Sequence, residues 1–104
     1  MIYMLHIRQI APGKMNEYRE LETKEMEPMF KKLGYKVLGH FSTIIGNSNE
    51  TVALHAYDDM AQYQRIRETA MKDPDYLKMA AKLNALTSTS TSRLLAPSEW
   101  SAMK

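Results

Sequence analysis

The chain has 104 residues, of which 44% are apolar and 25% are charged, a mixture that excludes intrinsic disorder and fits one globular domain. Its 14 lysines and arginines against 12 aspartates and glutamates leave a net charge of +2, and their scattered positions exclude a basic stripe for nucleic acid. The absence of cysteine excludes disulfides and thiolate chemistry. No apolar run approaches the roughly 20 residues of a membrane span, so we expect a cytoplasmic protein without nucleic-acid or membrane partners.

Residues 2–10 predict the first strand, because they are rich in β-branched and aromatic types and stop at the breaker Ala11-Pro12-Gly13. Strand alternation gives this segment one apolar face and one mixed face, which carry Tyr3, Leu5 and Ile7 and, opposite them, Met4, His6 and Arg8. We expect the apolar face to pack against helices.

Residues 14–33 change to a helical pattern, with four apolar positions from Met26 to Leu33 spaced i, i+3, i+4, i+7. Pro28 lies inside this run, so we expect the helix to kink or restart there. Gly34 follows the last apolar position and is expected to end the helix.

Residues 35–45 and 51–57 predict the second and third strands, joined as a hairpin through the turn-forming residues 46–50. Alternation in the third strand separates two sets of side chains, which are Val52, Leu54 and Ala56 on one face and Ala53, His55 and Tyr57 on the other.

Two helices and a strand complete the chain. Asp59 followed by Gln62 is similar to a capping box, and Asp73-Pro74 suits the cap and the first position of another helix. Residues 85–95, which include the run TSTSTS, predict the fourth strand, with a loose tail over about 97–104.

The order strand, helix, two strands, helix, strand predicts an α+β, ferredoxin-like βαββαβ domain whose four-stranded antiparallel sheet has its first and third strands in the centre. Helices cover only one face of such a sheet. We expect the other face to carry Phe41, Tyr57 and Met4 or their neighbours, which makes it too apolar to leave in water. A homodimer formed sheet against sheet is therefore expected, with a higher oligomer left open.

Several stretches resemble one known family over nearly the whole chain. They are the opening MIYMLHIRQIAPGK, the segment EPMFKKLGYKVLGHF, the stretch GNSNETVALHAYDDMAQYQR, Asp73-Pro74 and the segment around Arg93. Together they resemble the NIPSNAP family of the dimeric α/β-barrel superfamily, which implies a single NIPSNAP-like domain over residues 1–104 and a dimer that pairs into an α/β barrel. Met4, His6 and His55 stand where the family often has Glu, Arg and Trp, so roles of those usual residues do not carry over.

The three histidines, His6, His40 and His55, fall on neighbouring strands of the predicted sheet, and three imidazoles could bind a transition metal ion. Such a site depends on the hairpin register, since His40 opposes His55 only if paired residue numbers sum to 95. In the alternative that we favour, His6 and His55 are hydrogen-bonded residues of a pocket or interface, and His40 is separate. We expect no metal and no cofactor.

His6 or His55 can also serve as a general acid–base, because imidazole titrates near neutral pH. Arg8 shares a face with His6 and could hold an anionic or enolate oxygen, while Tyr57 shares a face with His55 and could donate a hydrogen bond. In the structural alternative, Arg8 pairs with an acidic residue at the dimer interface and Tyr57 is simply packed.

Two classes of function remain open. In the first, a small cofactor-independent enzyme binds an apolar, aromatic or polyketide-like metabolite and catalyses isomerisation, cyclisation or oxygenation, with His6, His55, Arg8 and Tyr57 as catalytic residues. In the second, the protein binds a ligand or a partner without turnover, and its sheet face is only a homodimer interface. We expect the ligand in a cavity beside the central strands, walled by these four residues and Met4, with the opposite strand faces packed against the helices.

Overall fold

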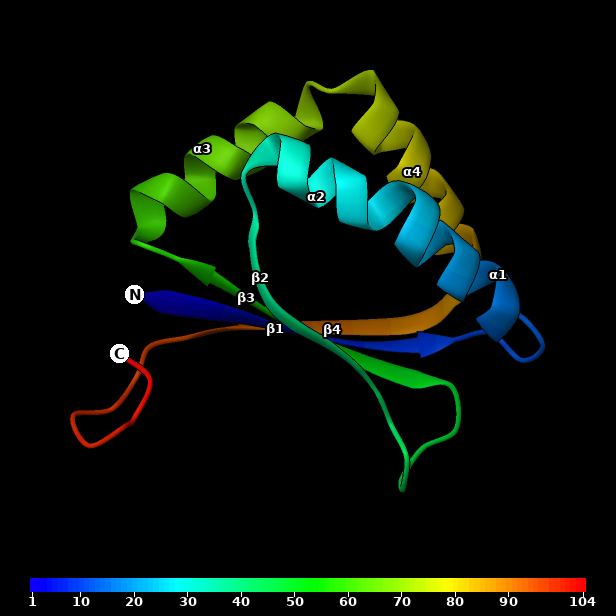
Figure 1. Cartoon of the computed structure of the whole chain (residues 1–104), viewed down its shortest axis with the longest axis horizontal. Helices are drawn as coiled ribbons and strands as arrows, with labels where there is room; N and C mark the ends of the chain where they lie inside the picture. Colours follow the sequence, from blue (N-terminus) through cyan, green and yellow to red (C-terminus); the bar gives the residue numbers. More distant parts are fainter.

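In the computed structural model, which describes residues 1–104, the helices lie on one face of a four-stranded antiparallel sheet (Figure 1). The strands are β1 (Ile2–Ile10), β2 (Lys36–Ser42), β3 (Glu50–Tyr57) and β4 (Thr87–Leu95), and they are arranged in the order β2-β3-β1-β4. The α+β, ferredoxin-like topology with β1 and β3 in the centre is therefore confirmed. β2 is shorter than predicted, so that the loop of its hairpin spans residues 43–49.

The first helical segment is interrupted just before its proline. α1 (Met15–Leu21) leads through a π-helical turn, η1 (Glu22–Met26), into α2 (Glu27–Leu33). Pro28 has no N–H to donate, and its ring would clash with the carbonyl group of residue 24 in a regular α-helix, so an irregular turn is expected directly before it. Gly34 ends α2 with φ at 85°, a conformation that favours glycine, as predicted.

Both remaining helices begin at the predicted caps. Asp59 precedes α3 (Met60–Met71), and its Oδ1 accepts a hydrogen bond from the backbone N–H of Gln62 at 2.8 Å. Asp73 precedes α4 (Pro74–Ala85) and accepts from the backbone N–H groups of Asp75 and Tyr76. No helix of the chain has the length and apolar character needed to cross a membrane.

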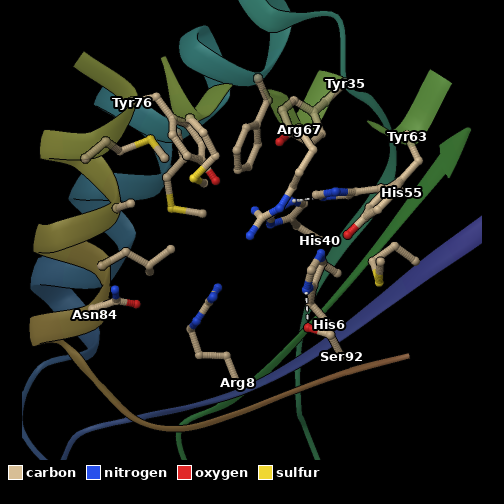
Figure 2. Close-up of a pocket in the computed structure, with 18 of the residues that line it drawn as sticks. His6, Arg8, Tyr35, His40, His55, Tyr63, Arg67, Tyr76, Asn84 and Ser92 are labelled. Carbon is tan, nitrogen blue, oxygen red and sulfur yellow. Dashed lines mark hydrogen bonds between the residues drawn. The ribbon is translucent and has the colours of Figure 1, made fainter. Parts of the chain in front are cut away.

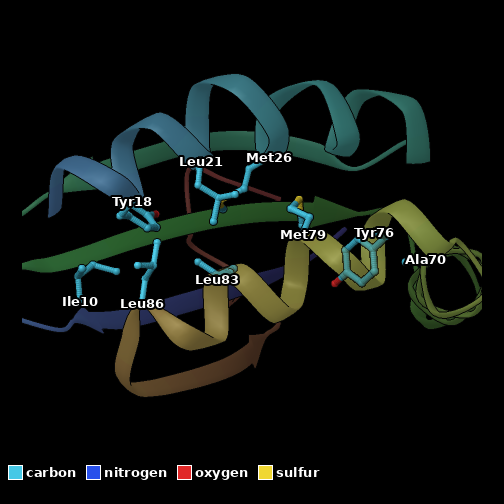
Figure 3. Close-up of a cluster of buried hydrophobic side chains, with 9 residues drawn as sticks. All are labelled: Ile10, Tyr18, Leu21, Met26, Ala70, Tyr76, Met79, Leu83 and Leu86. Carbon is cyan, nitrogen blue, oxygen red and sulfur yellow. The ribbon is translucent and has the colours of Figure 1, made fainter. Parts of the chain in front are cut away.

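Nine buried side chains form the hydrophobic core (Figure 3). They are Ile10, Tyr18, Leu21, Met26, Ala70, Tyr76, Met79, Leu83 and Leu86. Only Ile10 belongs to a strand, so the core is made mainly by helices that pack on one another near one end of the sheet. The middle of the sheet therefore needs a different kind of covering.

The helices cover the opposite face of the sheet from the one predicted. The pairings Met4–His55 and His6–Ala53 join the mixed faces of β1 and β3, and this joint face lies under the helices. The apolar faces, which we expected under the helices, form the open face instead, and they carry Tyr3, Leu5 and Ile7 of β1 and Val52, Leu54 and Ala56 of β3. The alternation of side chains along a strand shows which residues share a face. The right-handed crossover from β1 to β2 decides which of the two faces the helices cover.

The open face differs from the prediction in its residues as well. Phe41 lies there, paired with Val52, whereas Met4 and Tyr57 lie under the helices. The C-terminal residues, expected as a loose tail, return to the sheet, where the Tyr3 hydroxyl donates to the carbonyl oxygen of Lys104 at 3.0 Å. This contact explains why Tyr3 is buried on an otherwise open face.

The two isoleucines at positions 10 and 44 allow a direct test of this packing. Ile10 is fully buried in the core, while Ile44 in the hairpin loop is 97% exposed. Ile10→Ala should lower the free energy of unfolding by about 2–5 kcal/mol, because it removes buried methyl groups and leaves a void. Ile44→Ala should change it by less than about 0.5 kcal/mol. Urea unfolding measures both values, and similar values for the two variants would contradict the packing described.

Candidate functional site

A cavity of about 450 Å³ lies between the helices and the two central strands (Figure 2). Its floor includes all five side chains that were expected to wall such a cavity, which are Met4, His6, Arg8, His55 and Tyr57. Its roof is mostly apolar and aromatic, with Phe30, Tyr63, Tyr76, Met79 and Leu83 among the side chains from α2, α3 and α4. The structure thus brings the five residues together on the helix-covered face.

The strand register explains why the three histidines meet. His6 of β1 and His40 of β2 both pair with Ala53 of β3, one from each side. A bulge between Val37 and Gly39 shifts the register of β2 by one residue; without it, position 40 would pair with residue 52 on the open face. The ring centroid of His55 lies 5.2 Å from that of His6 and 5.6 Å from that of His40, so the interpretation of His40 as separate is wrong.

A chain of polar contacts links His55 through His40 to the first helical segment. The Tyr18 hydroxyl donates to Oε2 of Glu22 at 3.0 Å, and the same oxygen lies 3.3 Å from Nδ1 of His40. A carboxylate only accepts, so Nδ1 of His40 carries hydrogen, and Nε2 of His40 lies 3.4 Å from Nε2 of His55. The other ring nitrogen of His55, Nδ1, is buried and has no hydrogen-bond partner within the protein.

His6 is held from the other side of the cavity. Its Nδ1 lies 2.8 Å from the hydroxyl group of Ser92 on β4, while its Nε2 makes no hydrogen bond within the protein. Burial, reinforced by the positive charge of Arg8, lowers the pKa of His6 to about 4, and burial lowers the pKa of His55 to about 3. Both imidazoles are therefore neutral at pH 7 and can accept a proton.

Arg8 brings a positive charge to the cavity without a carboxylate to balance it. It forms no ion pair, and its buried Nε has no hydrogen-bond partner within the protein. Burial lowers the pKa of Arg8 and raises the pKa of Tyr57 to about 12, so at pH 7 Tyr57 is a neutral donor. Because Arg8 faces the cavity and not the open face, the alternative of an ion pair at a sheet-on-sheet interface does not fit its position.

The three histidines are close together without forming a metal site. No group of three or more His, Cys, Asp or Glu side chains in the chain is arranged to hold an ion. The contacts of His40 supply a reason, because its Nδ1 is turned toward Glu22 and its Nε2 toward His55. These nitrogens face partners within the protein instead of a shared point.

Sequence analysis missed Arg67 and the aromatic side chains that the helices contribute. Tyr63, Arg67 and Ala70 follow the spacing i, i+4, i+7 on α3, so helical periodicity contained the signal for Arg67. Tyr63 meets the predicted Tyr57 edge to face, with ring centroids 5.1 Å apart. Such contacts between separate elements have no signature in a single sequence.

The sequence also matches a known family, since a family model described as NIPSNAP covers residues 3–102. The chain belongs to the NIPSNAP family. No curated protein sequence matches it. Among solved structures, a NIPSNAP family protein from Agrobacterium tumefaciens is 24% identical with a TM-score of 0.91, over 99% of this chain and 98% of that one. An uncharacterized NIPSNAP domain protein from Burkholderia xenovorans is 21% identical with a TM-score of 0.88, over 97% and 98% of the two chains.

This NIPSNAP chain also shares its fold with proteins outside the family. SnoaB, a cofactor-independent oxygenase from Streptomyces nogalater, is 16% identical with a TM-score of 0.69, over 99% of this chain and 97% of that one. A putative antibiotic biosynthesis monooxygenase from Nitrosomonas europaea is 11% identical with a TM-score of 0.71, over 93% and 98%. Identities this low establish a common fold and leave the chemistry to the site itself.

The lowered pKa of His55 gives the stability of the protein a defined pH dependence. Unfolded histidine has a pKa near 6.5, so as the pH falls from about 6.5 toward 3 the unfolded chain takes up a proton that buried His55 resists. The stability that neutral His55 contributes is complete above pH 6.5 and is lost in that window. The unfolding free energy of wild type should therefore fall relative to that of His55→Gln, by at most about 1.4 kcal/mol per pH unit. Urea unfolding from pH 7.5 to 4 measures this.

Ile44→Ala is the control for this measurement, because its side chain lies in solvent and touches no titrating group of the cavity. The difference in unfolding free energy between Ile44→Ala and wild type should stay constant with pH. A difference between wild type and His55→Gln that is equally constant would show that His55 takes up its proton as readily in the folded protein as in the unfolded chain.

Proposed function

We propose that this NIPSNAP protein binds an apolar or aromatic small molecule in the cavity and transforms it by proton transfer without a cofactor. The observation that carries the proposal is the location of the two buried side-chain nitrogens that lack partners. They are Nε of Arg8 and Nδ1 of His55, and both residues line this cavity. Buried polar groups normally have hydrogen-bond partners, and exceptions gather where function requires them. The cavity's volume of about 450 Å³ is ordinary for a small-molecule site.

The chain's own residues supply the parts for such a reaction. Nε2 of His6 accepts a proton from an acidic C–H or O–H group of the ligand, while Ser92 holds the other ring nitrogen. Arg8, two residues along the same strand face, stabilises the oxyanion that develops. Tyr57 remains a neutral hydrogen-bond donor, and His55 orders the ring cluster through His40. The resulting anion then isomerises or cyclises, or it reacts with dioxygen, which is the oxidant and the source of oxygen for an oxygenation.

The shared fold of SnoaB, named as a cofactor-independent oxygenase, supports a reaction class of this kind. The alternative is a protein that binds its ligand without turnover. The unpartnered cation and the low pKa of both histidines favour a reactive site, because strongly perturbed titratable groups in a cavity are a mark of catalysis.

A pair of alanine substitutions tests the cavity, and a histidine variant tests the chemistry. Ala53 lies on the cavity floor between His6 and His40, whereas Ala61 is exposed on α3. With a panel of aromatic and polyketide-like compounds, Ala53→Leu should abolish ligand-induced thermal shifts because it fills the cavity, and Ala61→Leu should keep them. His6→Ala should leave binding nearly unchanged and lower turnover by about 10²–10⁴-fold, measured by mass spectrometry.

Other results would change the assignment. Equal thermal shifts in Ala53→Leu and wild type would place binding elsewhere. Turnover that survives in His6→Ala would remove His6 from the chemistry. No turnover in wild type, together with altered dimer stability in His6→Ala and His55→Ala, would favour the class without catalysis.

We propose further that a second copy of the chain covers the open face of the sheet. No helix covers this face (Figure 1), and strand pairing places the half-buried Leu5 and Ile7 of β1 and Val52 and Leu54 of β3 on it. Phe41 extends it onto β2; its ring lies across Gly39, where an added Cβ would come within 2.5 Å of it, and the side chain is still 58% exposed. An apolar sheet face of this kind is typical of a self-complementary interface.

Charge placed on this face should separate the copies. Phe41→Lys should make the protein monomeric at micromolar concentration, because it would bury an ammonium group in the interface. Leu77→Lys, on an exposed position of α4, should remain dimeric. Light scattering measures the mass of each. A wild-type protein that is itself monomeric at this concentration would reject the dimer.

A further inference from the structure

Two arginines that pair with no carboxylate extend into the cavity from opposite walls. Arg8 rises from β1 on the floor, and Arg67 descends from α3 (Figure 2). Neither forms an ion pair. All the ion pairs of the protein are formed by lysines and His40, so no arginine is paired, and Arg8 and Arg67 are the arginines that line the cavity.

The cavity contains no negative charge that could balance them. No Asp or Glu is among its lining residues, and the carboxylate of Glu22 lies beyond His40, where it is already engaged by His40 and Tyr18. The other titratable side chains of the lining are histidines and tyrosines; those whose pKa is shifted, such as His6, His55 and Tyr57, remain neutral at pH 7. Two positive charges therefore face an otherwise apolar and aromatic wall.

We propose that the molecule bound here is an organic anion, an apolar or aromatic body with a carboxylate group that Arg8 and Arg67 hold between them. This inference rests on the proposed function, since it takes the cavity as the ligand site. It goes beyond that function in placing a permanent charge on the ligand, where the reaction alone needs only an oxyanion that forms during turnover.

The chemistry of the guanidinium group favours a carboxylate. Its planar set of N–H donors matches the two oxygens of a carboxylate, and such charge-assisted hydrogen bonds are about twice as strong as neutral ones. Partial burial strengthens them further, because Arg8 is screened from water by the helix layer. Arg67 is exposed within α3, so it can meet an anion before Arg8 does.

A matched pair of probes isolates the charge. 1-Naphthoate and 1-naphthamide have nearly the same shape, but only the first is an anion at pH 7.5. Calorimetric titration at low salt should show naphthoate binding about tenfold more tightly or better, as expected for a charge-assisted contact. Arg8→Gln and Arg67→Gln should each remove most of this preference, because they should lower naphthoate affinity much more than naphthamide affinity.

Arg65→Gln is the matched control, because Arg65 is exposed on the same helix, does not line the cavity, and loses the same charge. It should keep the full preference for naphthoate. Arg67 lies at an exposed helical position, so Arg67→Gln remains decisive if Arg8→Gln does not fold.

The outcomes separate this inference from the proposed function. Equal affinity of wild type for the two probes would overturn the anion and leave the cavity as a site for neutral ligands. A preference for naphthoate that survives in Arg67→Gln, or that Arg65→Gln also loses, would overturn the assignment to these arginines. Binding of neither probe would overturn the anion alone, since the comparison of Ala53→Leu with wild type decides separately whether the cavity binds a ligand.

Discussion

Three imidazoles and a guanidinium group on the helix-covered face of the sheet are the constraint on which the rest of the structure depends. Packed dry, such groups would cost several kcal/mol in lost hydration. The structure meets this cost by keeping the helices away from the middle of the sheet. The hydrophobic core accordingly takes a single strand residue, Ile10, and is otherwise built between helices. The cavity is thus a consequence of where the polar side chains lie.

The π-helical turn connects this constraint to the first helix. Pro28 interrupts the regular hydrogen bonds, and the wider turn that precedes it begins at Glu22. The carboxylate of Glu22 accepts from Tyr18 and faces His40, which in turn contacts His55. A local backbone irregularity therefore lies next to the carboxylate that contacts the histidine cluster. Irregular turns of this kind are frequently found at functional sites.

The sequence alone could predict features that depend on residues close in the chain, such as helix ends. It could not predict features that depend on how separate helices and strands pack together. Asp59, Asp73 and Gly34 act within one turn of themselves, so the helix ends were predictable. The face of the sheet that the helices cover was not predictable, because it follows from the handedness of the crossover from β1 to β2 and not from the polarity of the side chains. The bulge after Val37, which turns His40 toward the cavity, has no reliable signature in one sequence. Arg67 could have been found from the periodicity of α3.

The arginines and histidines of the cavity also act on one another. Burial is the largest cause of the low pKa of His6, and the positive charges of Arg8 and Arg67 lower it further. A carboxylate held by the two arginines would cancel their field at the imidazole and so raise the pKa of His6 toward neutrality. His6 would then become a stronger base when an anionic ligand is in place than when it is not. Binding of the anion would in this way promote proton transfer, because the arginines that bind the carboxylate are the same groups that lower the pKa of His6.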